Sequence, residues 1–230
     1  MFQPFTINPS LSKLTYPFPS ADEIQKVLSG GTRRDRHIVI CLWLTEGAPF
    51  AFRKCPAIYE VVRGWLAHRL EIDSKQITLI GSARIGFSLA PPPEYGKSFN
   101  NRSDLDFSII SVEYFSRLSS TFNQFFSDYE QGKVVPRTDK QKKLWQANID
   151  FGERNIPRGF FDANKLPNYD QYPLVQQINH SMWVLLKRLE ITPDVPRVER
   201  ASVRVYRDWQ SFIDRVSLNL QKSLNNYSAA

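Results

Sequence analysis

The fold predicted for this chain depends on the stretch Ile77-Thr78-Leu79-Ile80-Gly81-Ser82-Ala83-Arg84-Ile85-Gly86. Residues 77–80 form a short, mostly β-branched apolar run that stops at a glycine, a pattern typical of a buried strand that ends in a turn. Ser82 is expected to be the N-cap of one or two helical turns, whose free backbone N–H groups suit a phosphate. Gly86 would allow another backbone or a nucleotide to approach closely.

A second motif follows after a long loop, in the stretch Ser103-Asp104-Leu105-Asp106-Phe107-Ser108-Ile109-Ile110. Period-two alternation puts Asp104, Asp106 and Ser108 on one face of a strand, with apolar residues on the other. Two neighbouring carboxylates repel each other, and a divalent cation is the simplest compensation. Because hard oxygen ligands suit Mg²⁺, the pair predicts a site for Mg²⁺ or Mn²⁺.

Together the two motifs resemble the signature of the nucleotidyltransferase superfamily of the DNA polymerase β type. That signature is a strand ending in Gly-Ser, a second glycine a few residues on, and Asp-x-Asp on the next strand. The resemblance covers residues 58–112, and the loop 89–102 is longer than the pattern expects. It implies an α/β (α+β) fold class: a small mixed sheet flanked by helices, with an α-helical C-terminal part.

The resemblance also implies an activity and a biological setting. Superfamily members include tRNA-modifying toxins, antibiotic-modifying enzymes, poly(A) polymerases and bacterial synthases of cyclic nucleotide signals. A magnesium-dependent transferase that binds a nucleotide such as ATP is therefore expected, in antiviral defence or a toxin system with a partner protein.

The resemblance assigns roles to residues of the two motifs. By resemblance, Asp104 and Asp106 would hold the metal, while Gly81 and Ser82 would hold the terminal phosphates. The further candidates for nucleotide contacts are Arg84, Gly86, Ser103 and Arg158.

Members of the superfamily usually bring a third carboxylate from a later strand, and two residues are candidates here. Asp162, in the run Arg158-Gly159-Phe160-Phe161-Asp162, is preferred as catalytic residue and metal ligand. Asp150 would serve if Ile149-Asp150-Phe151 were a strand. The helix-forming composition of residues 139–154 instead favours a helix with Asp150 facing solvent. That neither residue serves is the remaining alternative.

Composition limits the classes of function. Thirty Lys and Arg against 23 Asp and Glu give a net charge of +7, which favours polyanionic partners such as nucleotides or RNA. The N-terminus shows no signal-peptide pattern, and no apolar run is long enough to cross a bilayer. Cys41 and Cys55 are expected to be reduced thiols. A cytoplasmic protein without a membrane partner is therefore expected.

Three regions are predicted. Residues 1–20, rich in proline and aromatic residues, form an extended arm that packs Phe2, Phe5, Tyr16 or Phe18 onto the body. Residues 21–168 form the nucleotidyltransferase core, and residues 169–230 form a C-terminal helical part. Its last helix is expected to begin at about Glu199 and to present a basic face, as a solvated surface or as one wall of a cleft.

Local signals place the elements of the core. Ser20 and Glu23 predict a capping box at the start of a helix through Leu28. Further predictions are a basic loop at 32–36, a buried strand at 37–44, a helix that begins at Pro56 and a helix capped by Ser111.

These observations predict a nucleotidyltransferase that transfers a nucleoside monophosphate to an acceptor hydroxyl. The acceptor is left open among RNA or tRNA, a protein, a small molecule and a second nucleotide. One alternative is a catalytically inactive binding or regulatory module that has lost its third acid. Another is an RNA-binding adaptor that uses the basic C-terminal helix. The position of the third carboxylate separates the enzyme from the inactive module.

Overall fold

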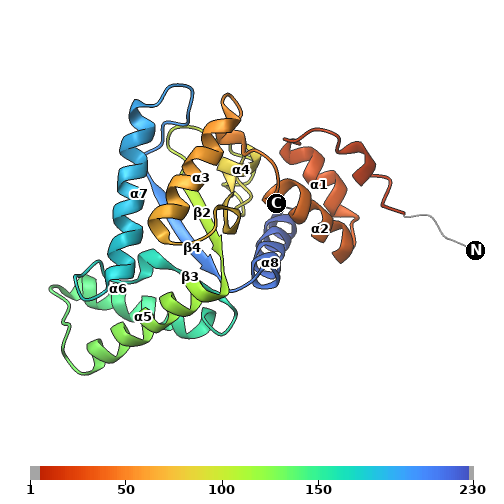
Figure 1. Ribbon diagram of the computed structural model, residues 1–230. Coiled ribbons are helices and arrows are strands. Elements are labelled where there is room, and N and C mark those ends of the chain that lie inside the picture. Colours follow the sequence, from red (N-terminus) through yellow and green to blue (C-terminus); the bar gives the residue numbers. More distant parts are fainter. Residues whose placement is uncertain (1–5, 228–230) are drawn as a thin grey trace, which may run out of the picture.

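A four-stranded mixed sheet lies at the centre of the computed structural model (Figure 1), which describes residues 6–227, with side chains through residue 224. In spatial order the strands are β1 (Ile77–Ile80), β2 (Leu105–Ile110), β4 (Ala201–Tyr206) and β3 (Phe160–Asp162). Strand β2 is antiparallel to β1 and parallel to β4, and β4 is antiparallel to β3. The predicted α/β fold class is confirmed.

Helices flank the sheet on both sides (Figure 1), with α3, α5, α6 and α7 on one side and α8, α1 and α2 on the other. The α-helices are α1 (Ala21–Ser29), α2 (Arg33–Val39), α3 (Pro56–Leu70), α4 (Ser82–Ile85), α5 (Val112–Glu130), α6 (Asp139–Asn155), α7 (Pro173–Ile191) and α8 (Trp209–Tyr227). A π-helical segment, η2 (Ile40–Thr45), continues α2, and short 3₁₀ turns lie at η1 (Leu11–Lys13), η3 (Phe50–Phe52), η4 (Ser74–Gln76) and η5 (Ala163–Lys165).

The two faces of β2 have different environments. Leu105, Phe107 and Ile109 are at most 1 % exposed and belong to the main core, with apolar residues of α3, α5 and α7. Full burial of such a side chain contributes about 1.5–3 kcal/mol to folding. Because side chains alternate along a strand, Asp106 and Ser108 face the opposite side, where α8 packs.

The segment 32–45 is helical, so the predicted basic loop and buried strand were wrong. Thr32 begins α2 in a capping box with Asp35, and the apolar run then continues into η2. Val39, Ile40 and Leu44 are buried in a second core with α1 and α8. Periodicity cannot distinguish a buried helix from a buried strand in so short an apolar run. The capping box is the local signal that favours the helix.

Other local predictions were correct. Ser20 and Glu23 form the capping box of α1, Pro56 is at the start of α3, and Ser111 caps α5. The N-terminal segment contacts the body through Phe18, whose ring lies 5.4 Å from that of Phe50. Tyr16 is instead 71 % exposed. Phe2 and Phe5 lie outside the described residues.

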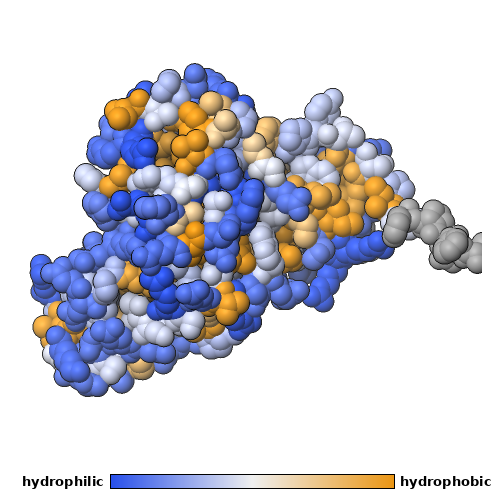
Figure 2. Space-filling model, in the orientation of Figure 1, coloured by the Kyte–Doolittle hydropathy of each residue, from blue (hydrophilic) through white to orange (hydrophobic). Residues whose placement is uncertain are grey.

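Apolar surface gathers over the N-terminal helices in the view of Figure 2, whereas hydrophilic residues cover most of the rest of this face. Exposed apolar side chains of this segment include Ile7 and Leu42, which are 56 % and 51 % exposed. No helix in the described part of the chain is both long and apolar enough to span a membrane.

The C-terminal part supplies a strand as well as helices. The predicted helix from about Glu199 was wrong at its start, because residues 201–206 form β4, and α8 begins only at Trp209. Strand β4 lies between β2 and β3. The sequence Ser202-Val203-Arg204-Val205 alternates polar and β-branched residues, the period of a half-buried strand.

Glycines shape both ends of α4. The N-cap is Gly81, with φ 68° and ψ −151°, and not Ser82, which is the first helical residue. Only glycine adopts this backbone conformation without a steric cost. Gly86 has φ 98°, and a Cβ on it would lie 2.8 Å from the ring of Phe50. The close approach at Gly86 is therefore made by a phenylalanine of the same chain.

We predict that Gly86→Ala lowers the free energy of unfolding by about 1–3 kcal/mol, because the new methyl group meets Phe50 and the backbone is strained. Gly30→Ala is the control, since Gly30 has a negative φ of −109° and nothing within 4 Å of an added Cβ. Gly30→Ala is expected to change the free energy of unfolding by no more than about 0.5 kcal/mol. Urea unfolding of both variants measures the difference, and equal midpoints would contradict the close contact.

Candidate functional site

A cavity of about 430 Å³ lies where the Gly81-Ser82 turn meets β2, β4 and α8. Its lining includes Gly81, Ser82, Asp106 and Arg204 from the sheet side and Lys222 from α8. The remaining lining residues are Leu44, Ile80, Ser88, Leu89, Ala90, Pro91, Val216, Asn219, Leu220 and Ser223. Both sequence motifs therefore contribute to one cavity, which has apolar walls and two cations.

Strand pairing brings the two motifs together. The register of β1 and β2 sets Ile80 opposite Asp106, so the chain turns at Gly81 directly beside this carboxylate. A Cβ on Gly81 would lie 3.6 Å from Asp106 Oδ2. The absence of a side chain thus leaves the space over Asp106 open to a ligand.

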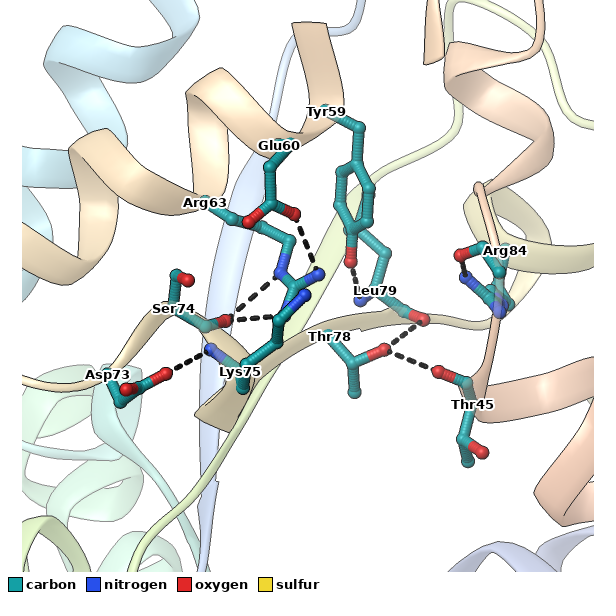
Figure 3. A network of polar contacts seen from close by, with 11 residues as sticks. Thr45, Tyr59, Glu60, Arg63, Asp73, Ser74, Lys75, Thr78, Leu79 and Arg84 are labelled. Atoms are coloured by element: carbon teal, nitrogen blue, oxygen red, sulfur yellow. Dashed lines mark hydrogen bonds and ion pairs between the residues drawn. The ribbon is translucent and has the colours of Figure 1, made fainter. Parts of the chain in front are cut away.

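Three hydrogen bonds hold β1 and the Gly81 turn in place through residues that do not line the cavity (Figure 3). The Arg84 guanidinium donates to the carbonyl of Gly47 at 2.6 Å, and the Thr78 hydroxyl donates to that of Thr45 at 3.2 Å. On the outer edge of β1, the Leu79 N–H donates to the Tyr59 hydroxyl at 3.2 Å. These contacts hold β1 and α4 against the end of η2, the loop after it and α3. The Tyr59 contact also pairs a backbone donor on an edge strand.

Arg84 was predicted to contact the nucleotide, but the structure places its side chain away from the cavity. Its side chain is 2 % exposed and does not line the cavity. Burial lowers the pKa of its guanidinium, and Tyr59 partly offsets this. The physical reason is helix geometry: two residues of helix rotate the side-chain direction by about 200°. Ser82 and Arg84 therefore cannot both face the cavity.

Asp106 is a half-buried carboxylate with one hydrogen-bond donor. The Ser202 hydroxyl on β4 donates to its Oδ1 at 2.7 Å. Burial raises the pKa of Asp106 above its usual value; the Ser202 hydrogen bond opposes this, and the nearby charge of Asp104 adds to it. A cation in the cavity would remove this electrostatic cost.

Asp104 precedes β2 and is more accessible than Asp106. Its Oδ1 accepts a hydrogen bond from the Arg200 Nε at 2.9 Å, and the Arg200 side chain is 74 % exposed. An ion pair this exposed contributes at most about 1 kcal/mol. The pair can therefore open at little cost when another cation approaches Asp104.

Asp162 lies on the same face of the sheet, but Arg204 separates it from the two other carboxylates. On β4, Arg204 is in register with Ser108 of β2 and with Asp162 of β3. Its guanidinium binds the Asp162 carboxylate in a bidentate pair, with Nη2 2.9 Å from Oδ2 and Nε on Oδ1. Within the described residues, no group of three or more His, Cys, Asp or Glu side chains is arranged to hold a metal ion. The predicted three-carboxylate cluster is therefore not assembled.

The other predicted site residues lie away from the cavity. Asp150 is exposed on α6, where the Gln146 amide donates to it at 3.0 Å, so the helical alternative was correct and the strand was wrong. The Ser103 hydroxyl accepts a hydrogen bond from the Asn100 N–H and stabilises a turn. Arg158 is exposed before β3, and Gly86 contacts Phe50. None of these residues lines the cavity.

Sequence reasoning missed Ser202 as a site residue and misplaced Arg204 on a helix. The signal that could have found them is the alternation of residues 202–205, which puts both side chains on one strand face. The contribution of Leu44 to the cavity had no comparable signal, because it depends on packing of η2 against α8.

The donor set fits one magnesium ion together with phosphate. Mg²⁺ is usually bound by one or two carboxylates and substrate phosphates, with water completing an octahedron. Asp104 and Asp106 supply such carboxylates, and the half-buried Asp106 has no cationic hydrogen-bond partner among the described residues. A second ion held by a third protein carboxylate does not fit, because Arg204 engages Asp162.

We predict that Asp106→Asn stabilises the metal-free protein at neutral pH. The raised pKa means that the folded state binds this proton more tightly than the unfolded state, so the charged carboxylate costs stability above its unfolded pKa of about 3.8. Asparagine keeps the acceptor for Ser202 and has no charge. The difference in melting temperature from wild type should shrink as the pH falls from 7 toward 4, in EDTA.

Asp150→Asn is the control, because this carboxylate is exposed and its replacement should change the melting temperature little. An Asp106→Asn protein less stable than wild type at pH 7 would contradict the burial cost.

Comparisons with known proteins gave no match: no protein-family model, no curated protein and no solved structure is significantly similar to the chain. The resemblance to the nucleotidyltransferase superfamily therefore stays a prediction from its two motifs.

Proposed function

We propose that the protein binds a nucleoside triphosphate with Mg²⁺ or Mn²⁺ and transfers its nucleoside monophosphate to an acceptor hydroxyl. The observation that supports this best is the shared cavity, in which the Gly81-Ser82 turn lies directly beside Asp106. Arg204 and Lys222 give the same cavity two cations. The glycine turn and the cations suit the phosphates of one ligand, the carboxylate suits its metal ion, and the apolar walls suit its base.

Each part of the cavity has a task in this proposal. The Ser82 hydroxyl and the N–H groups of the turn bind the terminal phosphates, since hydrogen bonds to charged groups are the strong ones. Lys222 on α8 contributes a positive charge from the opposite wall. The apolar residues Val216 and Leu220 of α8 cover the nucleoside.

Asp104 and Asp106 would hold the metal ion. When bound, this ion neutralises charge on the triphosphate and lowers the pKa of a coordinated hydroxyl. The acceptor oxygen then forms a bond to the α-phosphorus in line, the bond from that phosphorus to the bridging oxygen breaks, and pyrophosphate leaves. The hydroxyl proton passes to solvent. Asp104 is the more accessible of the pair and does not line the cavity, so its exposed ion pair with Arg200 would open for it to join the metal; the acceptor would be a hydroxyl of RNA, a protein or a nucleotide.

A second candidate is a catalytically inactive module that binds a nucleotide for sensing or assembly. The bidentate Arg204–Asp162 pair favours it, because a basic residue stands where the superfamily brings a third acid. Transfer assays separate the two. Wild type is incubated with each of four α-labelled nucleoside triphosphates, Mg²⁺ or Mn²⁺, and total RNA. Labelled acceptor or cyclised nucleotide supports the enzyme, and tight binding without product supports the module.

We predict that a nucleoside triphosphate with Mg²⁺ or Mn²⁺ raises the melting temperature. A ligand at a hundred times its Kd stabilises a protein by about 2.7 kcal/mol. The double variant Asp104→Asn with Asp106→Asn should remain folded and lose the metal-dependent part of the shift. Asp150→Asn, exposed on α6, should behave like wild type. A full shift in the double variant would place the metal elsewhere.

We predict that Ser82→Ala weakens triphosphate binding by about 1–2 kcal/mol, the usual worth of a hydrogen bond to a charged group. Isothermal titration at saturating Mg²⁺ measures the change in Kd. Ser103→Ala is the matched control, because Ser103 does not line the cavity and should keep wild-type affinity. Equal affinities in the two variants would remove the turn from the binding site.

A further inference from the structure

We propose that Arg204 binds a phosphate of the triphosphate, and that Asp162 pairs with the Arg204 guanidinium until the triphosphate enters the cavity. On binding, the guanidinium leaves the Asp162 carboxylate and takes a phosphate in its place. This inference rests on the proposed function, because it assigns a further residue to the same site. It makes Arg204 a contact of the ligand and Asp162 a positioning residue.

The position of Arg204 is the first observation. Its side chain lines the cavity together with Gly81, Ser82 and Asp106, and it is 28 % exposed. The Asp162 side chain is only 13 % exposed and does not line the cavity. A ligand in the cavity can therefore reach the guanidinium but not the carboxylate behind it.

The chemistry of the pair is the second observation. Asp162 occupies both Nε and Nη2 of Arg204 in a bidentate arrangement. The planar guanidinium fork matches carboxylate and phosphate equally well in geometry. A triphosphate has a higher negative charge than a carboxylate, so it competes for the same donors. Exchanging one anion for the other leaves the half-buried cation paired throughout, which avoids the large cost of an isolated charge.

Arg215 on α8 provides the third observation. Its guanidinium lies over the Phe160 ring, with 4.7 Å to the centroid, and its buried Nε has no hydrogen-bond partner in the described residues. It is close enough to interact electrostatically with both Arg204 and Asp162. When Arg204 moves to phosphate, Arg215 can therefore compensate the Asp162 carboxylate. Asp106 and Tyr206 also interact electrostatically with Arg204 and Asp162.

The exchange explains why a carboxylate of β3 lies behind Arg204, on the same face of the sheet as Asp106, without joining Asp104 and Asp106. An unpaired Arg204 beside an empty phosphate site would be a half-buried charge without a partner. Asp162 supplies that partner and fixes the rotamer of the guanidinium, at the price of competing with the ligand. The carboxylate should therefore weaken anion binding, which is the opposite of what a metal ligand would do.

The test measures binding of inorganic tripolyphosphate in EDTA by isothermal titration, so that neither metal nor base contributes. Asp162→Asn should bind at least about tenfold more tightly than wild type, because the neutral amide releases the guanidinium. Arg204→Met should bind at least about tenfold more weakly, in the Asp162→Asn background as well as alone. Asp214→Asn, which removes an equal charge from the exposed face of α8, is the control for net charge and should change affinity less than twofold.

A second measurement uses the wild-type protein. The Arg204 Nε–H resonance, assigned by its loss in Arg204→Lys, should shift when tripolyphosphate saturates the protein. An unmoved resonance, or Asp162→Asn binding no more tightly than wild type or its Asp214→Asn control, overturns the exchange.

These outcomes are distinct from failure of the proposed function. If a metal–nucleotide complex binds through Asp104 and Asp106 but Asp162→Asn shows no tighter tripolyphosphate binding, the exchange is wrong and the function stands. If tripolyphosphate follows the predicted order but no nucleoside triphosphate binds with metal, the exchange stands and the nucleotide is the wrong ligand.

Discussion

Strand β2 can bury only one of its faces in the main core, and the rest of the structure follows from this constraint. Leu105, Phe107 and Ile109 take the buried face, against α3, α5 and α7. Asp106 and Ser108 must then point to the other side, because successive side chains alternate. A shift of pairing by one residue would bury Asp106 in the main core, so the apolar face also fixes the register that sets Asp106 beside Gly81.

Charge on the opposite face is arranged around three carboxylates with three different partners. Asp104 pairs with the exposed Arg200, Asp106 accepts from a neutral serine, and Asp162 is held by Arg204. Of the three, Asp106 alone has no cationic hydrogen-bond partner among the described residues, and its partial burial raises its pKa, which is an electrostatic cost. A fold can tolerate such a cost where a ligand later removes it. A carboxylate with a raised pKa beside an open cavity is therefore a candidate for part of a binding site.

Strand β4 decides between the competing accounts of this site. It lies between β2 and β3, so any carboxylate on β3 must reach past the side chains of β4. Those side chains are Ser202 beside Asp106 and Arg204 beside Asp162. In place of a third acid, β4 therefore supplies a serine that donates to Asp106 and an arginine that lines the cavity. Recognition of phosphate is therefore better supported by the geometry than a second metal held by protein carboxylates.

Much of the candidate site could be predicted from local signals. The strand that ends at Gly81, the alternation around Asp106 and the capping boxes each involve residues only a few positions apart. Their geometry is set by backbone sterics and nearby hydrogen bonds. Errors arose where a local pattern had two solutions, as in residues 37–44, whose apolar run suits a buried helix as well as a buried strand.

The sequence by itself determined the Gly81 turn, the polar face of β2 and the starts of α1, α3 and α5, because short-range periodicity and capping specify them. Only the tertiary structure decided which distant side chains meet there. The placement of β4 brought Arg204 between Asp162 and Asp106, and the one-turn helix α4 directed Arg84 away from the cavity to Gly47. Such pairings depend on sheet order and side-chain direction, which arise from packing of the whole chain and have no signature within a few neighbouring residues.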